Sequence, residues 1–250
     1  MKKIILFFLV LFFVNSIQAQ QFIDKATIEY EVKTSIKKSM GNDMWAEMMK
    51  ENLPTFKIAY FKFTFSGNKS LYKLDHFDEK NKIPDYIKKE DEDNEWYVDH
   101  SNNMLDMKKI VVGSPIFVKD SLPVINWKLT NENMMIAGFN CRKAVGKIFD
   151  SVYVFAFYTD EILISGGPCS IGGLPGMIMA MTIPRLYCSW VATKVSVVGI
   201  NETTIKPAIS KKPFLKKDFK NLLADRTKDW EEYYKDDKSV IHRFLWNAWL

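Results

Sequence analysis

The sequence predicts a mainly β fold, of the α+β type, with a short helix near the N-terminus and helices at the C-terminal end. Short runs of apolar and alternating residues recur through most of the chain, separated by polar turns, which is typical of antiparallel strands. The last part of the chain instead shows helical spacing. Because the strands follow one another at hairpin distances, we expect a long antiparallel meander curved into a half-barrel or barrel-like sheet.

The first strand and the first helix are predicted from their apolar spacing. Residues 26–33 alternate between apolar and charged side chains, which predicts a strand with one buried face. Residues 42–52 predict a short helix with an apolar stripe, which Asn42 can cap and Pro54 ends.

The next segment predicts a hairpin followed by a solvated loop. Residues 56–65 and 70–74 flank Ser66-Gly67-Asn68-Lys69, a strong turn signal. The first arm is apolar on both faces, so we expect each face to be covered. Residues 75–94 are rich in Asp, Glu and Lys, and we expect a loop there with at most one helical turn.

Further strand pairs are predicted where two apolar runs flank a polar turn. These pairs are 95–99 with 104–111, 125–129 with 134–137, 141–149 with 152–159, and 177–182 with 187–198.

The C-terminal segment changes character. Residues 206–213 form a basic linker, 214–235 show helical spacing, and Ser239 can cap a last helix. The final seven residues contain five large apolar side chains, so we expect this tail to dock on its own domain.

The N-terminus has the pattern of an export signal. Met1-Lys2-Lys3 precedes an apolar run over 4–14, and cleavage is expected after Ala19. We therefore expect three segments: a signal peptide over 1–19, a β domain over 20–205, and a linker with a helical tail over 206–250. No later segment is long and apolar enough to span a membrane. The predicted location is the periplasm, the cell surface or the medium.

A segment rich in glycine and proline is the most unusual feature of the chain. Gly172, Gly173, Pro175 and Gly176 surround Leu174, and they predict a shaped loop that turns the chain into the strand beginning at Met177. The loop contains neither a nucleophile–base pair nor a phosphate-binding spacing. We therefore predict a structural role for it, with no catalytic residue.

These residues carry a family resemblance, with Ile178 completing the motif. Gly173-Leu174-Pro175-Gly176-Met177-Ile178 resembles the motif that gives the GLPGLI family its name; these are secreted proteins found mainly in Bacteroidetes and largely uncharacterised. The resemblance extends to Cys141-Arg142-Lys143-Ala144, to Ala156-Phe157-Tyr158-Thr159-Asp160-Glu161-Ile162 and to Gly167-Pro168, with apolar departures at Phe157, Leu163 and Met177. It implies an exported protein without an established activity.

The three cysteines, Cys141, Cys169 and Cys188, all lie in the region of that resemblance. In an oxidising compartment we expect one disulfide that includes Cys169, with Cys141 as its partner and one thiol left over. Three reduced, buried cysteines are the next alternative. A metal site comes third, because the cysteines lack C-x₂-C spacing.

Candidates for chemistry are few. His76 and His100 adjoin aspartates in polar turns, where solvation is the usual state, and no hydrolase or phosphate-binding motif occurs. Met177, Met179 and Met181 share a strand with alternating spacing, which suits core packing and also a copper site. We predict neither a metal ion nor a cofactor.

The aromatic content of 14% indicates a large apolar interior or a partly open concavity. A net charge of +5, which falls to +3 without Lys2 and Lys3, does not indicate a nucleic-acid partner. The predicted function is a non-enzymatic, exported binding or accessory protein whose partner is a hydrophobic ligand or an envelope protein. A copper-handling protein and an unrecognised hydrolase are the alternatives.

Overall fold

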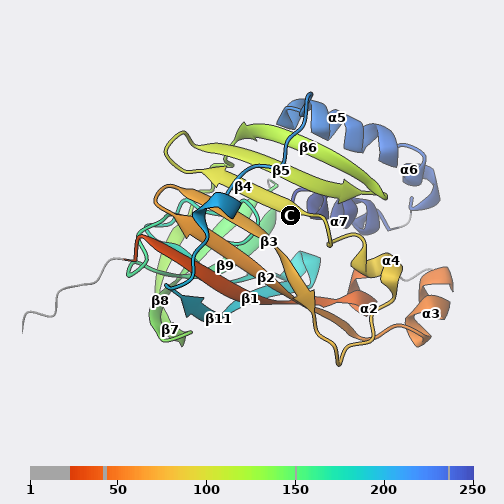
Figure 1. Cartoon of the computed structure of the whole chain (residues 1–250). Helices are drawn as coiled ribbons and strands as arrows, with labels where there is room; N and C mark the ends of the chain where they lie inside the picture. The colour runs from red at the N-terminus through yellow and green to blue at the C-terminus, as the bar shows by residue number, and fades with distance from the viewer. Residues whose placement is uncertain (1–22, 42–43, 150, 236) are drawn as a thin grey trace, which may run out of the picture.

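The structure is a computed structural model that describes residues 23–41, 44–149, 151–235 and 237–250 (Figure 1). The predicted signal peptide and the predicted Asn42 cap lie outside these residues. Within them, eleven strands form one antiparallel sheet, and short helices lie against it at both ends of the chain. No described helix combines the length and the apolar character that crossing a membrane requires.

Most consecutive strands are joined by hairpin turns, and a few are joined by longer connections. The strands are β1 (Lys25–Ser35), β2 (Phe56–Ser66), β3 (Lys69–Phe77), β4 (Glu95–Asp99), β5 (Met104–Val111), β6 (Ser114–Ser121), β7 (Lys128–Ile136), β8 (Phe139–Ile148), β9 (Val152–Thr159), β10 (Met177–Ile183) and β11 (Cys188–Ser196). The α-helices are α2 (Ile36–Ser39), α3 (Met44–Glu51), α4 (Asp85–Lys88), α5 (Lys216–Thr227), α6 (Trp230–Tyr233) and α7 (Ser239–Asn247), and single 3₁₀ turns, η2 and η3, span Pro184–Leu186 and Glu202–Thr204.

The strand order is that of an up-and-down barrel opened at one seam. Neighbours in the sheet follow the order β6-β5-β4-β3-β2-β1-β11-β10-β9-β8-β7, so strands pair with the next along the chain within β1–β6 and within β7–β11, and β1 pairs with β11. Among consecutive strands, only β6 and β7 are not hydrogen-bonded neighbours. Register shifts in β1, β2 and β10 mark irregularities that bend and twist a sheet. The prediction of a curved antiparallel meander is confirmed, and the sheet is open.

Two strands differ from the sequence prediction. Residues 125–129 and 134–137 were expected to pair with each other, but one strand, β7, runs through the supposed turn and pairs with β8. The hairpin turn instead lies at Ala137 and Gly138, which both have positive φ, as tight hairpin turns require. Strand β6 was not predicted, because Pro115 and its polar C-terminal half obscure the apolar alternation.

The concave face of the sheet carries the core. Strand β2 buries Ala59, Phe61, Phe63 and Phe65 on this face. Its opposite face, which was also expected to be covered, is half-buried; there the Tyr60 ring stacks on His76 with their centroids 4.7 Å apart. A second, small cluster of Leu71, Tyr97 and Ile205 joins β3 and β4 to the linker that follows β11. The coverage of the two faces is therefore unequal.

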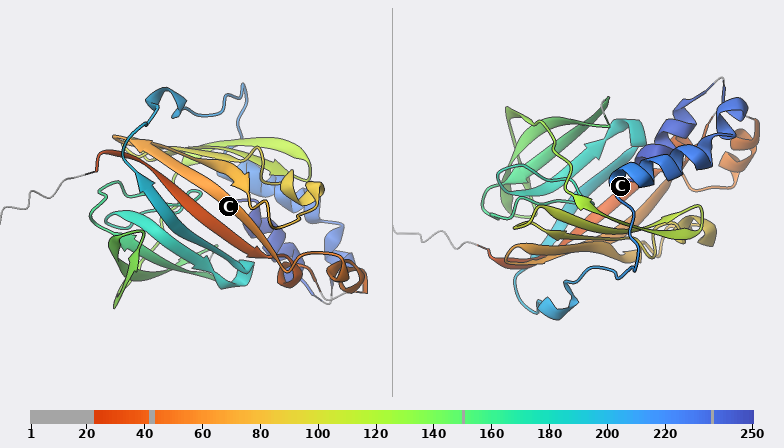
Figure 2. Two further views of the ribbon diagram at one scale, coloured as in Figure 1. Left: turned by 60° about the horizontal axis from the view of Figure 1, so that its bottom comes forward. Right: turned by 90° about the horizontal axis from the view of Figure 1, so that it is seen from above.

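The linker protects one edge of the open seam. Phe214 forms a parallel bridge with Val118 of β6: the Phe214 amide donates to the Phe117 carbonyl (2.7 Å), and the Lys119 amide donates to the Phe214 carbonyl (2.9 Å). An unpaired strand edge is an aggregation risk, and a covering segment removes part of it. From Phe214 the chain continues into α5, α6 and α7, which lie together beside β5 and β6 (Figure 2).

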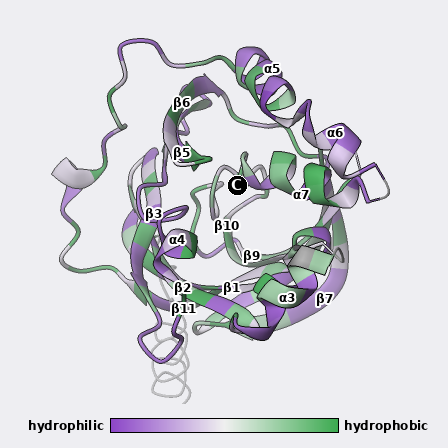
Figure 3. Cartoon of the chain, turned by 90° about the vertical axis from the view of Figure 1, so that its right-hand side faces the viewer, coloured by the Kyte–Doolittle hydropathy of each residue, from purple (hydrophilic) through white to green (hydrophobic). Residues whose placement is uncertain are grey.

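The C-terminal tail packs against the concave side of the sheet. The Phe219 ring of α5 meets the Trp249 ring edge to face, with their centroids 4.6 Å apart. Ala248 and Leu250 belong to the main core cluster. Figure 3 shows the C-terminus inside the curve of the sheet, surrounded by helices. Ser239 does not cap α7, because Asp237 accepts a hydrogen bond from the Ser239 amide (3.1 Å) in its place.

The tail should therefore contribute strongly to stability. Phe219→Ala removes a fully buried ring and should lower the free energy of unfolding by about 3–5 kcal/mol. Tyr233→Ala is the matched control: Tyr233 is 66% exposed on α6, and its loss should change stability by less than about 0.5 kcal/mol. Urea unfolding followed by circular dichroism measures both. Equal effects would contradict a tail that packs on the domain.

Candidate binding site

The glycine-rich loop is anchored to the core through Leu174, while Gly173 and Pro175 are exposed. Leu174 is buried and belongs to the main core cluster. The Trp127 indole donates a hydrogen bond to the Gly172 carbonyl (2.9 Å), and the Gly173 amide donates to the Ser165 hydroxyl (3.1 Å). Hydrogen bonds from backbone and side chains therefore fix the loop at both glycines.

The loop then turns the chain into β10 through a tight contact at Gly176. Gly176 has φ +142°, and its amide donates to the Leu174 carbonyl (2.8 Å) across Pro175. A Cβ atom placed on Gly176 would lie 2.0 Å from the Thr159 carbonyl oxygen, closer than atoms can approach. Met177 and Ile178 follow as fully buried residues of β10. The geometry of this turn therefore requires glycine at position 176.

His100 lies beside the segment that leads into this loop. Its Nε2 atom is 2.9 Å from the Ser70 hydroxyl, and a Cβ on Gly166 would lie 3.4 Å from its ring. Burial lowers the pKa of His100 to about 4, although Asp99 and the Ser165 backbone act in the opposite direction. The sequence placed this histidine in a solvated turn. The structure instead has it as a partly buried, neutral ring.

The three cysteines are buried free thiols, and no disulfide joins Cys141 to Cys169. Cys141 lies on β8, whereas the Cys169 thiol donates to the Leu250 carbonyl (3.1 Å) and shares a cavity with Cys188. Burial raises the pKa of Cys141 to about 11 and that of Cys188 to about 12, and it raises the pKa of Cys169 further. The thiols are therefore protonated at neutral pH, a state with little nucleophilic character.

The methionines of β10 belong to the core. Met177, Met179 and Met181 are all fully buried in the main cluster, which is the packing role that their spacing suggested. Within the part of the chain that the structure describes, no group of three or more His, Cys, Asp or Glu side chains is arranged to hold a metal ion.

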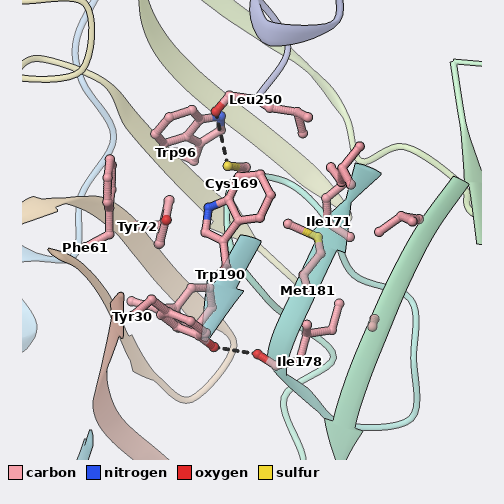
Figure 4. Packing of buried hydrophobic residues seen from close by; sticks show 14 of the residues in the cluster. Tyr30, Phe61, Tyr72, Trp96, Cys169, Ile171, Ile178, Met181, Trp190 and Leu250 are labelled. Atoms are coloured by element: carbon pink, nitrogen blue, oxygen red, sulfur yellow. Dashed lines mark hydrogen bonds between the residues drawn. The ribbon is translucent and has the colours of Figure 1, made fainter. Parts of the chain in front are cut away.

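A cavity of about 410 Å³ lies between the concave face of the sheet and the C-terminal tail. Its walls come from β1–β5 and β11, from the first helices of the chain and from α7. Buried residues such as Tyr72, Trp96 and Leu250 form its floor, while the exposed side chains of Tyr86 and Val112 mark its mouth. Figure 4 shows Phe61, Tyr72, Trp96 and Trp190 facing one another in this region. Its volume is typical of sites that bind small molecules.

Charged and polar groups enter the cavity at a few points. Lys57 and Asp91 form an ion pair on its wall. Burial disfavours the charge on Lys57, but the Asp91 carboxylate outweighs that effect, so the pKa of Lys57 is raised. Burial lowers the pKa of Lys109, which Asp91 opposes only in part. Glu90 lies on the exposed rim, and partial desolvation raises the pKa of its carboxyl.

The sequence analysis did not identify this cavity. Its polar residues, among them Lys57, Asp91, Trp96 and Lys109, come from β2, the loop after α4, β4 and β5. The sequence analysis assigned no role to any of these four residues. Only the curvature of the sheet brings these residues together.

Comparisons with known proteins give one matching family model and solved structures of similar fold. A family model described as "N-glycanase peptide, N-terminal domain" matches residues 80–215, which is more than half of the chain. Two solved structures of PNGF-II, in P21 and C2 space groups, each match with a TM-score of 0.52, at 15% and 16% sequence identity. The matches cover 80% and 79% of this chain but 33% and 32% of those proteins, so this chain spans about a third of their length. No curated protein matches it.

Gly176 provides a test of the loop. Gly176→Ala should destabilise the protein by at least about 1 kcal/mol more than Gly138→Ala, because only the former brings a Cβ against a backbone carbonyl. Gly138 is the matched control: its φ is also positive, and a Cβ there meets no atom within 4 Å. Denaturant unfolding compares the two. Similar losses would show that the Thr159 contact can relax.

His100 should make the protein sensitive to mild acid. The unfolded chain takes up a proton near the ordinary pKa of about 6.5, whereas the folded chain resists protonation down to about pH 4. The stability that His100 contributes is therefore complete above pH 6.5 and is lost as the pH falls through this window.

His100→Asn should thus lose less stability than the parent between pH 7 and pH 4.5, as measured by urea unfolding at both values. An unchanged acid sensitivity in His100→Asn would rule out His100 as the cause of the stability loss in mild acid.

Proposed function

This chain belongs to the family described as N-glycanase peptide, N-terminal domain, and from that premise we propose that it is an exported, non-enzymatic binding or accessory protein of the cell envelope. In this proposal the concave sheet and the tail hold a small hydrophobic guest between them. The observation that carries it is the cavity of about 410 Å³, which has an aromatic and aliphatic floor and a mouth open at one end of the sheet.

Export is supported by the first residues of the chain. A basic start, an apolar run and a small residue at Ala19 form the pattern of a cleaved signal peptide. The run over 4–14 is about half as long as a membrane span, which favours cleavage over anchoring.

A non-catalytic role is supported by the part of the relatives that matches. The family description names an N-glycanase, but it calls the region that matches this chain the N-terminal domain. This chain spans only about a third of PNGF-II. The raised pKa values of the three thiols also oppose nucleophilic cysteine chemistry. Full burial of Met177, Met179 and Met181 favours packing over the alternative of copper handling.

The neutral fluorescent probe N-phenyl-1-naphthylamine tests this function. It should bind saturably, with a blue-shifted emission, when it is excited beyond the absorption of tryptophan. Ile87→Trp, on the rim of the cavity, should obstruct the mouth and raise the dissociation constant at least fivefold. Ile58→Trp is the matched control, because Ile58 lies on the other face of β2 and does not line the cavity. Non-saturable binding, or equal loss in both variants, would contradict the proposal.

A further inference from the structure

We propose that the guest of this cavity is an amphiphile with a carboxylate headgroup, which the Lys109 ammonium and the Trp96 indole N–H bind together. The apolar body would lie along the floor of the cavity. This inference rests on the proposed function and specifies its ligand class. It is carried by a buried hydrogen-bond donor without a partner among the described residues, the Trp96 indole, and by a neighbouring cation, Lys109, that forms no ion pair among them.

The first donor is the indole N–H of Trp96. Trp96 lines the cavity and is only 2% exposed, yet its Nε1 atom has no hydrogen-bond partner among the described residues. Buried polar atoms are nearly always paired, and an unpaired one in a native protein points to a missing partner. The Tyr72 hydroxyl on the same wall also has no hydrogen-bond partner among the described residues.

The second donor is the ammonium group of Lys109. Its Nζ atom lies over the face of the Trp96 ring, 5.2 Å from the ring centroid, in a cation–π contact, so the ammonium and the indole belong to the same part of the wall. Of the two lysines that line the cavity, only Lys57 forms an ion pair within the described part of the chain. Asp91 and Glu90 both act to raise the pKa of Lys109, but among the described residues neither carboxylate lies within ion-pair distance of its ammonium. Of the two lysines in the cavity, Lys109 is therefore the one whose positive charge is less fully balanced by a nearby carboxylate.

The chemistry of these groups selects an anionic acceptor. The ammonium and the indole have hydrogens to donate and no lone pair to accept with, while a carboxylate offers two oxygens that accept several hydrogen bonds. A hydrogen bond between an ammonium and a carboxylate is about twice as strong as a neutral one. An alcohol could satisfy one donor but would leave the charge of Lys109 uncompensated. An amine would be repelled by it.

The rest of the cavity fits an apolar chain. Phe61, Trp190 and Phe244 line it from β2, β11 and α7, and Leu250 lies on its floor. Its volume of about 410 Å³ falls within the range of roughly 300–1,000 Å³ that is usual for sites holding small organic ligands. The guest would therefore have a single acidic group and an apolar body of moderate length.

Displacement of N-phenyl-1-naphthylamine by three twelve-carbon amphiphiles tests this inference. Dodecanoate, dodecanol and dodecylamine share one chain and differ in the headgroup, and each is used below its critical micelle concentration. Dodecanoate should displace the probe at about tenfold or more lower concentration than dodecanol, and dodecylamine should be the weakest. Lys109→Met keeps the apolar stem and should remove this preference, with dodecanol changed less than twofold.

Two further variants keep the test decisive. Lys108→Met is the matched control, because Lys108 pairs with Asp93 (3.6 Å) and does not line the cavity. It should retain the full preference for dodecanoate. Trp96→Phe keeps an aromatic ring but removes the N–H, and it should weaken dodecanoate binding more than dodecanol binding.

The outcomes separate the two proposals. If N-phenyl-1-naphthylamine binds but the three headgroups compete equally, or if Lys109→Met leaves the preference intact, the carboxylate assignment is overturned while the binding function stands. A preference for dodecylamine would reverse the assigned charge. If the probe does not bind at all, the proposed function fails and this inference fails with it.

Discussion

The pairing of β1 with β11 is the constraint on which the rest of the structure depends. It joins the meander β1–β6 to the meander β7–β11, so that one curved sheet forms in place of two small ones. The register sets Val32 opposite Trp190 and Thr34 opposite Cys188, and all four residues line the cavity. The Tyr30 hydroxyl also donates to the Ile178 carbonyl of β10 (2.6 Å), which ties the first strand to the strand that follows the glycine-rich loop.

The open seam and the tail are two consequences of this arrangement. Because β6 and β7 do not pair, the concave face is accessible from that side, and the chain after β11 can cross the edge of β6 at Phe214 and fold back over it. The tail covers part of the concave face without filling it. The cavity itself opens near Tyr86 and Val112, at α4 and just after β5, and no described residue of β6 or β7 lines it.

Local signals in the sequence predicted the elements better than the site. Alternation located β1, and turn residues located the β2–β3 hairpin and the loop around Gly176, because each depends on residues close together in the chain. Strand β7 was misread because its exposed middle, residues 130–133, is polar and resembles a turn. The separation of Cys141 from Cys169, which the sequence analysis had paired, and the meeting of Trp96 with Lys109 depend on register and curvature. Neither can be read from spacing along the chain.

The central claim is that the space between sheet and tail is a binding site with its acid-binding end at Lys109. A crystal structure of the protein grown with dodecanoate tests it most directly. We expect electron density for the chain in the cavity, with carboxylate oxygens within about 3.2 Å of Lys109 Nζ and Trp96 Nε1. Dodecanoate bound only on the outer face of the sheet, or bound in the cavity with its carboxylate at the mouth, would contradict the account.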